Sequence, residues 1–466
     1  MGKSGRREFL KRTAKLGAAL LPFVSRLNSA SGQRRPNILF LFSDDQRFDT
    51  IHALGNKEII TPNMDRLVKR GTAFTHAFIM GSTRGAVCVC SRAMLLTGRT
   101  LYRAEPIEKG TTFPELLREH GYVTFGTGKW HNGRETFAWG FTRGAKIFFG
   151  GMSNHLQVPV YDFDPEGKYP KGKAYKGEKF SSELFSDAAI QFLREYDGKR
   201  PFLLYVAYTA PHDPRMAPEK YAKMYDPSKI SLPKNFLPEH PFDNGEMKIR
   251  DEKLAPWPRT PEVVRKHIAD YYAMITHLDA QIGRVLDALE QSGHAQNTII
   301  IFSGDNGLAV GQHGLMGKQN LYEHSVRVPL VFCGPGIPQG KTSDALCYMH
   351  DIFPTICDLA GLPVPSTVEG KSLAPIISGK SRKVRDSVFG AYRNVQRMVR
   401  EERFKLIEYF VRGKKTTQLF DLASDPWETT NLSSDNRYAE TISRLRGELR
   451  QWQKKVDDPM ADKWPA

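Results

Sequence analysis

The chain has 466 residues, of which 40% are hydrophobic, and it carries a formal charge of +16. This length and composition support a large folded core and exclude intrinsic disorder, and no apolar run reaches the roughly 20 residues of a membrane helix. The positive charge favours an anionic ligand, but no fingerprint of a nucleic-acid-binding module accompanies it. We therefore expect neither nucleic acid as a partner nor stable membrane insertion.

The N-terminal segment has the features of an export signal. A basic stretch with adjacent Arg6 and Arg7 precedes a weakly apolar run from Leu16 to Val24, and small residues follow around Ala30. Paired arginines followed by Phe-Leu-Lys are similar to a twin-arginine (Tat) signal, with an ordinary basic signal peptide or an amphipathic helix as alternatives. We expect the Tat machinery to export the chain to the periplasm or the exterior of a bacterial cell.

Apolar runs with helical patterns between them predict a layered α/β domain. The run from Pro36 to Phe42 has no polar face, as expected of a central strand in a parallel sheet. Apolar residues from Ile275 to Leu289 recur at helical spacing, and Gly293 follows where the helix should end. Strands that alternate with helices indicate a largely parallel sheet. The other strand-like runs are residues 202–207, 298–302 and 328–332.

The pattern changes beyond about Val388. Short strand-like segments at 403–409 and 417–421 follow one another closely, and a helix is predicted from about Tyr438 to Val456. They predict a smaller α+β subdomain with an antiparallel sheet. Earlier in the chain, residues 213–260 are predicted to form a long loop near the active site. The predicted organisation is an export signal at 1–30, the main α/β domain at 36–385 and the C-terminal subdomain at 386–466.

The strongest local signal is the segment Cys88-Val89-Cys90-Ser91-Arg92, with Leu-Thr-Gly-Arg ending at Arg99. It resembles the signature of formylglycine-dependent sulfatases, in which Cys-x-Pro/Ala-Ser-Arg leads to Leu-Thr-Gly-Arg and the Cys is oxidised to formylglycine. The resemblance implies that a formylglycine-generating or sulfatase-maturating enzyme modifies Cys88, whose aldehyde hydrate attacks sulfur. Cys90 departs from the Pro or Ala of the signature. Alone, the two thiols also fit a metal chelate, a short disulfide or buried structural cysteines.

Polar residues follow two of the predicted core strands. Asp44 and Asp45 follow the first strand, and Asp305 and Asn306 follow the strand at 298–302. Carboxyl ends of neighbouring parallel strands meet at one crevice, where these oxygens suit a hard cation such as Ca²⁺ or Mg²⁺. Each pair alone is more often a cap or a turn. The family resemblance implies one Ca²⁺ per chain, with the ligands Asp44, Asp45, Cys88, Asp305 and Asn306.

Basic groups matching the family complete the predicted site. They lie in Gly-Lys-Trp-His (Lys129, His131), Ala-Pro-His (His212) and Gly-Lys (Lys318). Together with Arg92 they predict a positive cradle for a sulfate group, although each one alone is more often an ordinary loop residue. The resemblance implies that the two lysines hold sulfate oxygens. It also implies that His212, alone or together with Lys318, protonates the leaving oxygen, and that His131 accepts a proton as sulfate departs.

The resemblance extends from Asn37 to Leu432 and implies an alkaline-phosphatase-like sandwich with sulfuric ester hydrolase activity. Export and basic charge favour a sulfated carbohydrate as the substrate. His155 and His313 are predicted to contact it, with a structural role as the alternative for each. Two other functions stay open, namely a formylglycine-type hydrolase of phosphonate or phosphate monoesters and an inactive binder of sulfated glycans.

Overall fold

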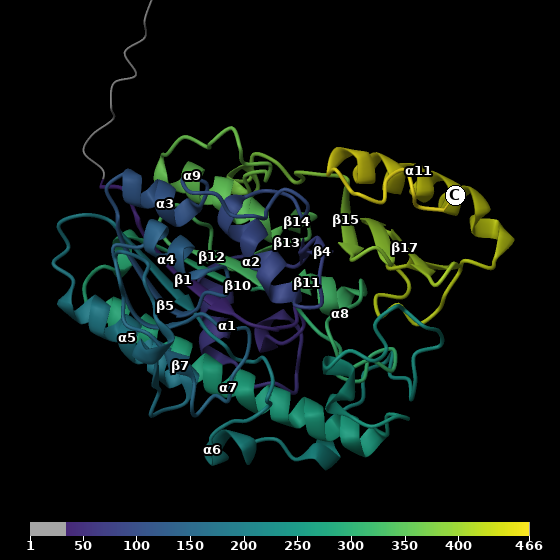
Figure 1. Cartoon of the computed structure of the whole chain (residues 1–466), viewed down its shortest axis with the longest axis horizontal. Helices are drawn as coiled ribbons and strands as arrows, with labels where there is room; N and C mark the ends of the chain where they lie inside the picture. Colours follow the sequence, from purple (N-terminus) through teal and green to yellow (C-terminus); the bar gives the residue numbers. More distant parts are fainter. Residues whose placement is uncertain (1–33, 466) are drawn as a thin grey trace, which may run out of the picture. The chain divides into compact units, whose positions relative to one another are not determined.

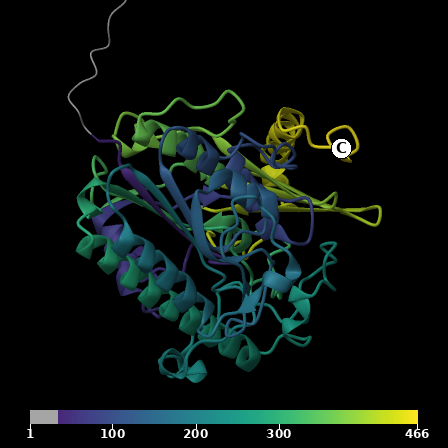
Figure 2. The same cartoon turned by 60° about the vertical axis from the view of Figure 1, so that its left-hand side comes forward.

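The structure is a computed structural model that describes residues 34–465, and the predicted export signal at 1–30 lies outside the described residues. From Arg35 onward the chain forms one compact unit. Figures 1 and 2 show a large sheet between layers of helices, with a smaller sheet and helix α11 (Ala439–Lys455) in the C-terminal region. This arrangement confirms the predicted α/β class with a smaller antiparallel sheet.

The large sheet has eight strands in the order β13-β2-β12-β10-β1-β9-β5-β6. The strands from β10 to β6 are parallel, whereas β12 runs antiparallel to both of its neighbours. The sheet is therefore largely parallel, as predicted. The strands are β13 (Lys341–Ser343), β2 (Gly71–Phe74), β12 (Leu330–Cys333), β10 (Thr298–Gly304), β1 (Asn37–Ser43), β9 (Phe202–Ala207), β5 (Val123–Lys129) and β6 (Arg143–Phe148).

Helices bury both faces of this sheet, which explains why its central strands have no polar face. On β1, Phe40 and Phe42 join one apolar cluster, whereas Leu39 and Leu41 join the other. This division follows the two-residue period of a strand. The first face packs against α2 (Val87–Thr97), α3 (Phe113–Glu119), α4 (Arg134–Gly140) and α9 (Ile352–Ala360), and the second against α1 (Pro62–Arg70), α5 (Ser181–Glu195) and α7 (Pro261–Gln291).

The smaller sheet joins distant parts of the chain. Its four C-terminal strands form an antiparallel meander, and β4 (Gly81–Ser82) pairs in parallel with β15 through Gly81 and Ala391. Because β4 comes just before α2, this pairing holds the start of that helix against the C-terminal region. The predicted division between 385 and 386 stays a prediction. The meander strands are β15 (Ser387–Tyr392), β16 (Gln396–Glu401), β17 (Phe404–Val411) and β18 (Lys414–Asp421).

The remaining elements are short. The predicted loop at 213–260 contains only α6 and two 3-10 turns, and no helix within residues 34–465 is long and apolar enough to cross a membrane. The short elements are β3 (Ala77–Phe78), β11 (Arg327–Val328) and β14 (Cys347–Tyr348) in one sheet, β7 (Pro159–Val160) and β8 (Tyr175–Lys176) in another, and the helices α6 (Glu219–Ala222), α8 (Glu323–Val326) and α10 (Ala374–Ile377).

Candidate active site

The predicted acidic residues meet at the carboxyl ends of β1 and β10. The backbone N–H of Asp45 donates to Oδ1 of Asp305 at 2.9 Å, and Nδ2 of Asn306 donates to Oδ1 of Asp45 at 2.7 Å. Asp44 is completely buried beside them. Asp45 has a φ of 61°, which a residue other than glycine adopts mainly where its surroundings enforce it. The parallel pairing of the two strands thus brings residues 260 positions apart into one cluster.

Cys88 lies in the first turn of α2, with 2% of its surface exposed. Its Sγ is 3.4 Å from Nζ of Lys129 and 3.3 Å from Nδ1 of His131. Burial raises the pKa of the Cys88 thiol, and Lys129 opposes this shift. The helix N-terminus and the nearby lysine both favour negative charge at this point, as a nucleophilic oxygen on the same carbon would require.

Cys90 points away from Cys88, because positions two apart on a helix do not face one another. Its Sγ lies 3.3 Å from Oγ of Ser82 and 3.5 Å from Oε2 of Glu105. Both cysteines are free, and the groups of possible metal ligands found within residues 34–465 include Cys88 but not Cys90. The structure therefore supports neither a disulfide nor a shared chelate between the two thiols.

Each of the three carboxylates pairs with a lysine or arginine side chain. Nε of Arg92 donates to Asp305 at 2.8 Å, and Nζ of Lys318 donates to Asp45 at 2.6 Å. Lys129 pairs with Asp44. Burial alone lowers the pKa of a lysine, but the adjacent carboxylates outweigh it and raise the pKa values of Lys129 and Lys318 above the usual range. Both lysines are therefore charged, as the predicted cradle requires.

The acidic cluster also meets the requirements of a cation site. One oxygen or sulfur atom from each of Asp44, Cys88 and Asp305 lies within 4.8 Å of the other two. Among residues 34–465, neither Oδ1 of Asp44 nor Oδ1 of Asn306 has a hydrogen-bond partner, although both atoms are buried. Buried oxygens that lack a donor suit a bound cation, and the carboxylate and amide oxygens of this cluster are ligands that Ca²⁺ and Mg²⁺ prefer. The predicted ligands thus fit a hard divalent ion.

The two histidines occupy different positions around this cluster. Nε2 of His212 is 3.6 Å from Oδ2 of Asp45, and its Nδ1 donates to the backbone oxygen of Asp213 at 2.8 Å. Burial lowers the pKa of His212 to about 4, against the opposing effect of Asp45. Burial and the neighbouring Lys129 lower the pKa of His131 to about 2. Neutral imidazoles next to Cys88 and Asp45 are available to accept protons.

His155 and His313 lie in other surroundings. His155 is 3% exposed, and its nitrogens contact Oγ of Ser181 at 2.8 Å and the backbone oxygen of His212 at 2.9 Å. His313 is 5% exposed and stacks on the ring of Tyr322, with the ring centroids 3.8 Å apart. The observed contacts of His155 support the segment that carries His212. Contact of either histidine with substrate stays a prediction.

Several residues that support the site had no signal in the sequence. The hydroxyl of Tyr271, on α7, donates to the backbone oxygen of Asp45 at 2.6 Å and accepts from the N–H of Arg47 at 3.0 Å. The carboxylate of Glu252 accepts from the N–H groups of Met316 and Gly317, both at 3.0 Å, just before Lys318. Such contacts depend on tertiary packing. Among the contacts described for the site, only that of His212 with its chain neighbour Asp213 could be expected from adjacency in the sequence.

A sulfatase family model matches residues 36–362, which is more than half of the chain. The chain belongs to the sulfatase family. It is therefore an enzyme that hydrolyses sulfate esters, and the predicted family, fold and enzyme class are confirmed. A second family model, the C-terminal region of N-sulphoglucosamine sulphohydrolase, matches residues 311–455.

Curated relatives include several bacterial sulfatases. The N-acetylglucosamine-6-O-sulfatase of Bacteroides thetaiotaomicron is 28% identical, covering 91% of this chain and 87% of its own. The arylsulfatase of Clostridium perfringens is 29% identical, covering 88% and 93%. Among solved structures, a protein in complex with its own substrate, D-glucosamine-2-N,6-O-disulfate, matches this chain with a TM-score of 0.79 and 25% identity. The match covers 93% of this chain and all of the other protein. The phosphonate monoester hydrolase of Agrobacterium radiobacter (TM-score 0.69, 23% identity, covering 89% and 96%) shares the fold.

Proposed function

We propose that this sulfatase removes sulfate from a sulfated saccharide, with formylglycine made from Cys88 as the nucleophile and one bound Ca²⁺. The observation that carries the proposal is the position of Cys88 between Lys129 and His131, at the edge of the acidic cluster. An aldehyde hydrate at this position would face Lys129, His131 and the oxygens of the acidic cluster, which are groups that sulfate transfer needs.

The residues of the site would have the following roles in the reaction. One hydroxyl of the hydrate attacks sulfur, while Lys129 and Lys318 hold the sulfate oxygens. His212 donates a proton to the leaving oxygen, and a sulfate group bound beside its ring would favour the protonated form. His131, 3.3 Å from the sulfur of Cys88, then removes a proton from the second hydroxyl, so that sulfate leaves and the aldehyde returns.

The cation would be held by the oxygens of Asp44, Asp45, Asp305 and Asn306 and by the modified side chain at position 88. The unpartnered oxygens of Asp44 and Asn306 support this assignment. When bound, Ca²⁺ supplies positive charge that stabilises a developing oxyanion. Arg92 fixes the shape of the site, because its guanidinium joins Asp305 to the backbone oxygen of Lys129.

A sulfated amino sugar is the first substrate to test. The relatives include an N-acetylglucosamine-6-O-sulfatase and a complex with D-glucosamine-2-N,6-O-disulfate, and the C-terminal model is named after an N-sulphoglucosamine sulphohydrolase. The formal charge of +16 also favours anionic saccharides. The predicted signal at 1–30 would place the enzyme outside the cytoplasm, with a maturation enzyme and the Tat machinery as its partners before export.

A substrate panel tests the function. Glucosamine 6-sulfate, glucosamine N-sulfate, a phosphonate monoester and the matching phosphate monoester are compared by kcat/KM. We expect at least one sulfated sugar to exceed both phosphorus esters by about 100-fold or more, a difference of roughly 2.7 kcal/mol in the activation barrier. Preference for the phosphonate would indicate the alternative hydrolase, and binding of the sugars without turnover by matured protein would indicate a glycan binder.

A further inference from the structure

A second group of buried metal-ligand side chains shares no residue with the active-site cluster. It consists of His313, His324 and Glu428, with one possible ligand atom from each within 4.8 Å of the other two. The three residues are 5%, 4% and 2% exposed, respectively. His324 belongs to α8, His313 to the segment that joins β10 to α8, and Glu428 to the turn after β18. Three separate segments thus converge on one buried point.

Both ring nitrogens of His324 are buried. Neither Nδ1 nor Nε2 of its ring has a hydrogen-bond partner in the part of the chain that the structure describes. Nδ2 of Asn235 lies 3.1 Å from Nε2 of His313 and fixes that ring, while Oδ1 of the same amide has no partner within residues 34–465. Buried polar atoms without partners destabilise a fold, so their concentration here indicates a bound ion or an ordered water molecule.

The donor set distinguishes these two occupants. Two imidazoles and a carboxylate are typical zinc ligands and are too rich in nitrogen for Ca²⁺. Both ring nitrogens of His324 lack a hydrogen-bond partner within residues 34–465, so this ring can direct a lone pair at an ion. At His313, the ion would replace the N–H of Asn235 that Nε2 now accepts.

The carboxylate of Glu428 retains binding capacity despite its two contacts. Nζ of Lys405 lies 2.7 Å from Oε1, and the N–H of Glu323 donates to Oε2 at 2.8 Å. A carboxylate has about four lone-pair sites, so each oxygen can accept one more bond. Lys405 is also 3.1 Å from the carboxylate of Glu323, which offsets its charge. The lysine therefore does not exclude a cation on the far side of Glu428.

The backbone at two of the three residues is strained. The φ angle is 54° at His313 and 58° at Glu428, in the left-handed region that favours glycine. Such conformations persist where the surrounding structure enforces them, and they concentrate at ligand sites. Within the described residues, the active site shows the same feature at Asp45 and His131.

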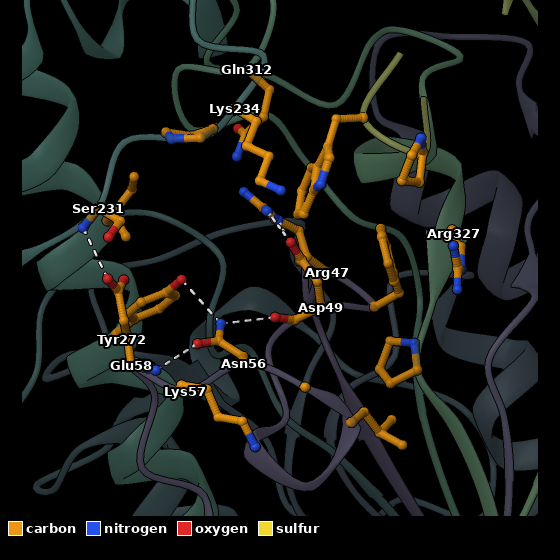
Figure 3. A pocket seen from close by; sticks show the side chains of 18 of the residues that line it. Arg47, Asp49, Asn56, Lys57, Glu58, Ser231, Lys234, Tyr272, Gln312 and Arg327 are labelled. Carbon is orange, nitrogen blue, oxygen red and sulfur yellow. Dashed lines mark hydrogen bonds and ion pairs between the residues drawn. The ribbon is translucent and has the colours of Figure 1, made fainter. Parts of the chain in front are cut away.

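We propose that His313, His324 and Glu428 bind a divalent transition-metal ion of the zinc type, as a structural site separate from the catalytic cation. The ion fastens the segment that carries Lys318 to the turn that follows β18. A cavity of about 480 Å³ lies nearby, and its lining includes Gln312 and Trp427, the chain neighbours of His313 and Glu428. Figure 3 shows Gln312 and Lys234 together at one side of this cavity.

The zinc content of the loaded protein tests the proposal directly, because this measurement does not depend on sulfate hydrolysis. The full chain is produced without a histidine tag and in a Cys88→Ala background, which removes the thiol that could bind zinc at the active site. After incubation with ZnCl₂ and gel filtration, elemental analysis should find about one zinc per chain. Co²⁺ loading should give the visible absorption of a site with nitrogen and oxygen ligands.

Variants assign the zinc to these residues. His324→Gln and Glu428→Gln should each weaken zinc affinity by at least about 100-fold, more than loss of an outer contact to a ligand causes. The matched control is His240→Gln, a buried histidine 3.1 Å from the hydroxyl of Tyr322 and outside the three-residue group, which should keep full affinity. If one glutamine variant fails to fold, the other variant and the cobalt spectrum of the parent chain decide.

Three outcomes would overturn the proposal. One is a parent chain that holds no zinc and gives no cobalt spectrum after loading. The second is zinc affinity that is unchanged in both His324→Gln and Glu428→Gln. The third is a crystal of the zinc-soaked protein with only water between the three side chains. In each case the unpartnered nitrogens of His324 belong to a buried water site.

Discussion

Nζ of Lys129 lies 3.4 Å from Sγ of Cys88 and also pairs with Oδ2 of Asp44. One lysine thus joins the predicted nucleophile to the predicted cation site. Lys129 is the last residue of β5, and its position depends on the pairing of β5 with β9 and of β9 with β1. The central sheet therefore fixes the distance between the groups that would carry out sulfate transfer.

Removal of the Tyr271 hydroxyl should weaken the proposed cation site without removing a ligand side chain. This hydroxyl holds the backbone on both sides of the turn at Asp45 and Arg47. We expect Tyr271→Phe to raise the Ca²⁺ concentration needed for half-maximal activity by about 10- to 100-fold, the usual effect of an outer-shell contact. Saturating Ca²⁺ should restore most of kcat.

Tyr272→Phe is the matched control for this measurement. Its hydroxyl accepts from Nδ2 of Asn56 at 3.1 Å, on the cavity side in Figure 3, and within residues 34–465 it makes no hydrogen bond to Asp45 or Arg47. The control variant should need the same Ca²⁺ concentration as the parent enzyme. Equal shifts in both variants would mean that Tyr271 acts through general packing of α7.

Asp305→Ala should abolish turnover and leave the protein folded. Asp305 contributes a carboxylate to the proposed cation and also pairs with Arg92 at 2.8 Å, so its loss removes the charge that the site needs. We expect a fall in kcat/KM of at least about 1,000-fold, with an unchanged circular dichroism spectrum. Chelation of the parent enzyme should have the same effect, reversed by Ca²⁺. Full activity after exhaustive dialysis against EDTA would refute the metal assignment.

Loss of His212 should slow the hydrolysis of sulfate esters with poor leaving groups more than that of esters with good leaving groups. Its Nε2 lies 3.6 Å from Oδ2 of Asp45, at the edge of the acidic cluster. A sugar alkoxide needs a proton as it leaves, whereas an electron-poor phenolate hardly does. His212→Ala should therefore reduce kcat on a sugar sulfate by about 100-fold or more and on nitrophenyl sulfate by much less. Equal losses on the two substrates would exclude the acid role.

Local sequence predicted the elements whose pattern carries a physical signal. The run from Pro36 to Phe42 became β1 because both faces of that strand are buried, and the apolar stripe up to Leu289 became the inner face of α7. The convergence of Asp45 and Asp305 followed from the rule for parallel strand ends. These predictions needed only periodicity and strand direction.

Tertiary contacts account for what the sequence did not predict. Nothing near Tyr271 or Glu252 indicates that these residues hold the backbone of the active site, because their partners lie far along the chain. The predicted substrate contact of His313 rested on residue type alone, and the structure places this residue against Tyr322 and His324. Side-chain environments of this kind follow from packing and not from local pattern.

The state of Cys90 is a secondary test of the maturation proposal. Its sulfur faces Ser82 and Glu105, so it does not compete for the position of the nucleophile. Cys90→Ala restores the commoner family signature and should keep or raise the fraction of chains that are modified. Cys88→Ala should be inactive, because no hydrate can form.

Mass spectrometry of the peptide that contains Cys88 and Cys90, from active protein of the native host, tests the central claim most directly. We predict an aldehyde at position 88, detectable by its reaction with a hydrazide, and an unmodified thiol at position 90. The modified fraction should rise in proportion to specific activity across preparations. An active preparation in which Cys88 is still a thiol, or in which the aldehyde is at position 90, would contradict the mechanism.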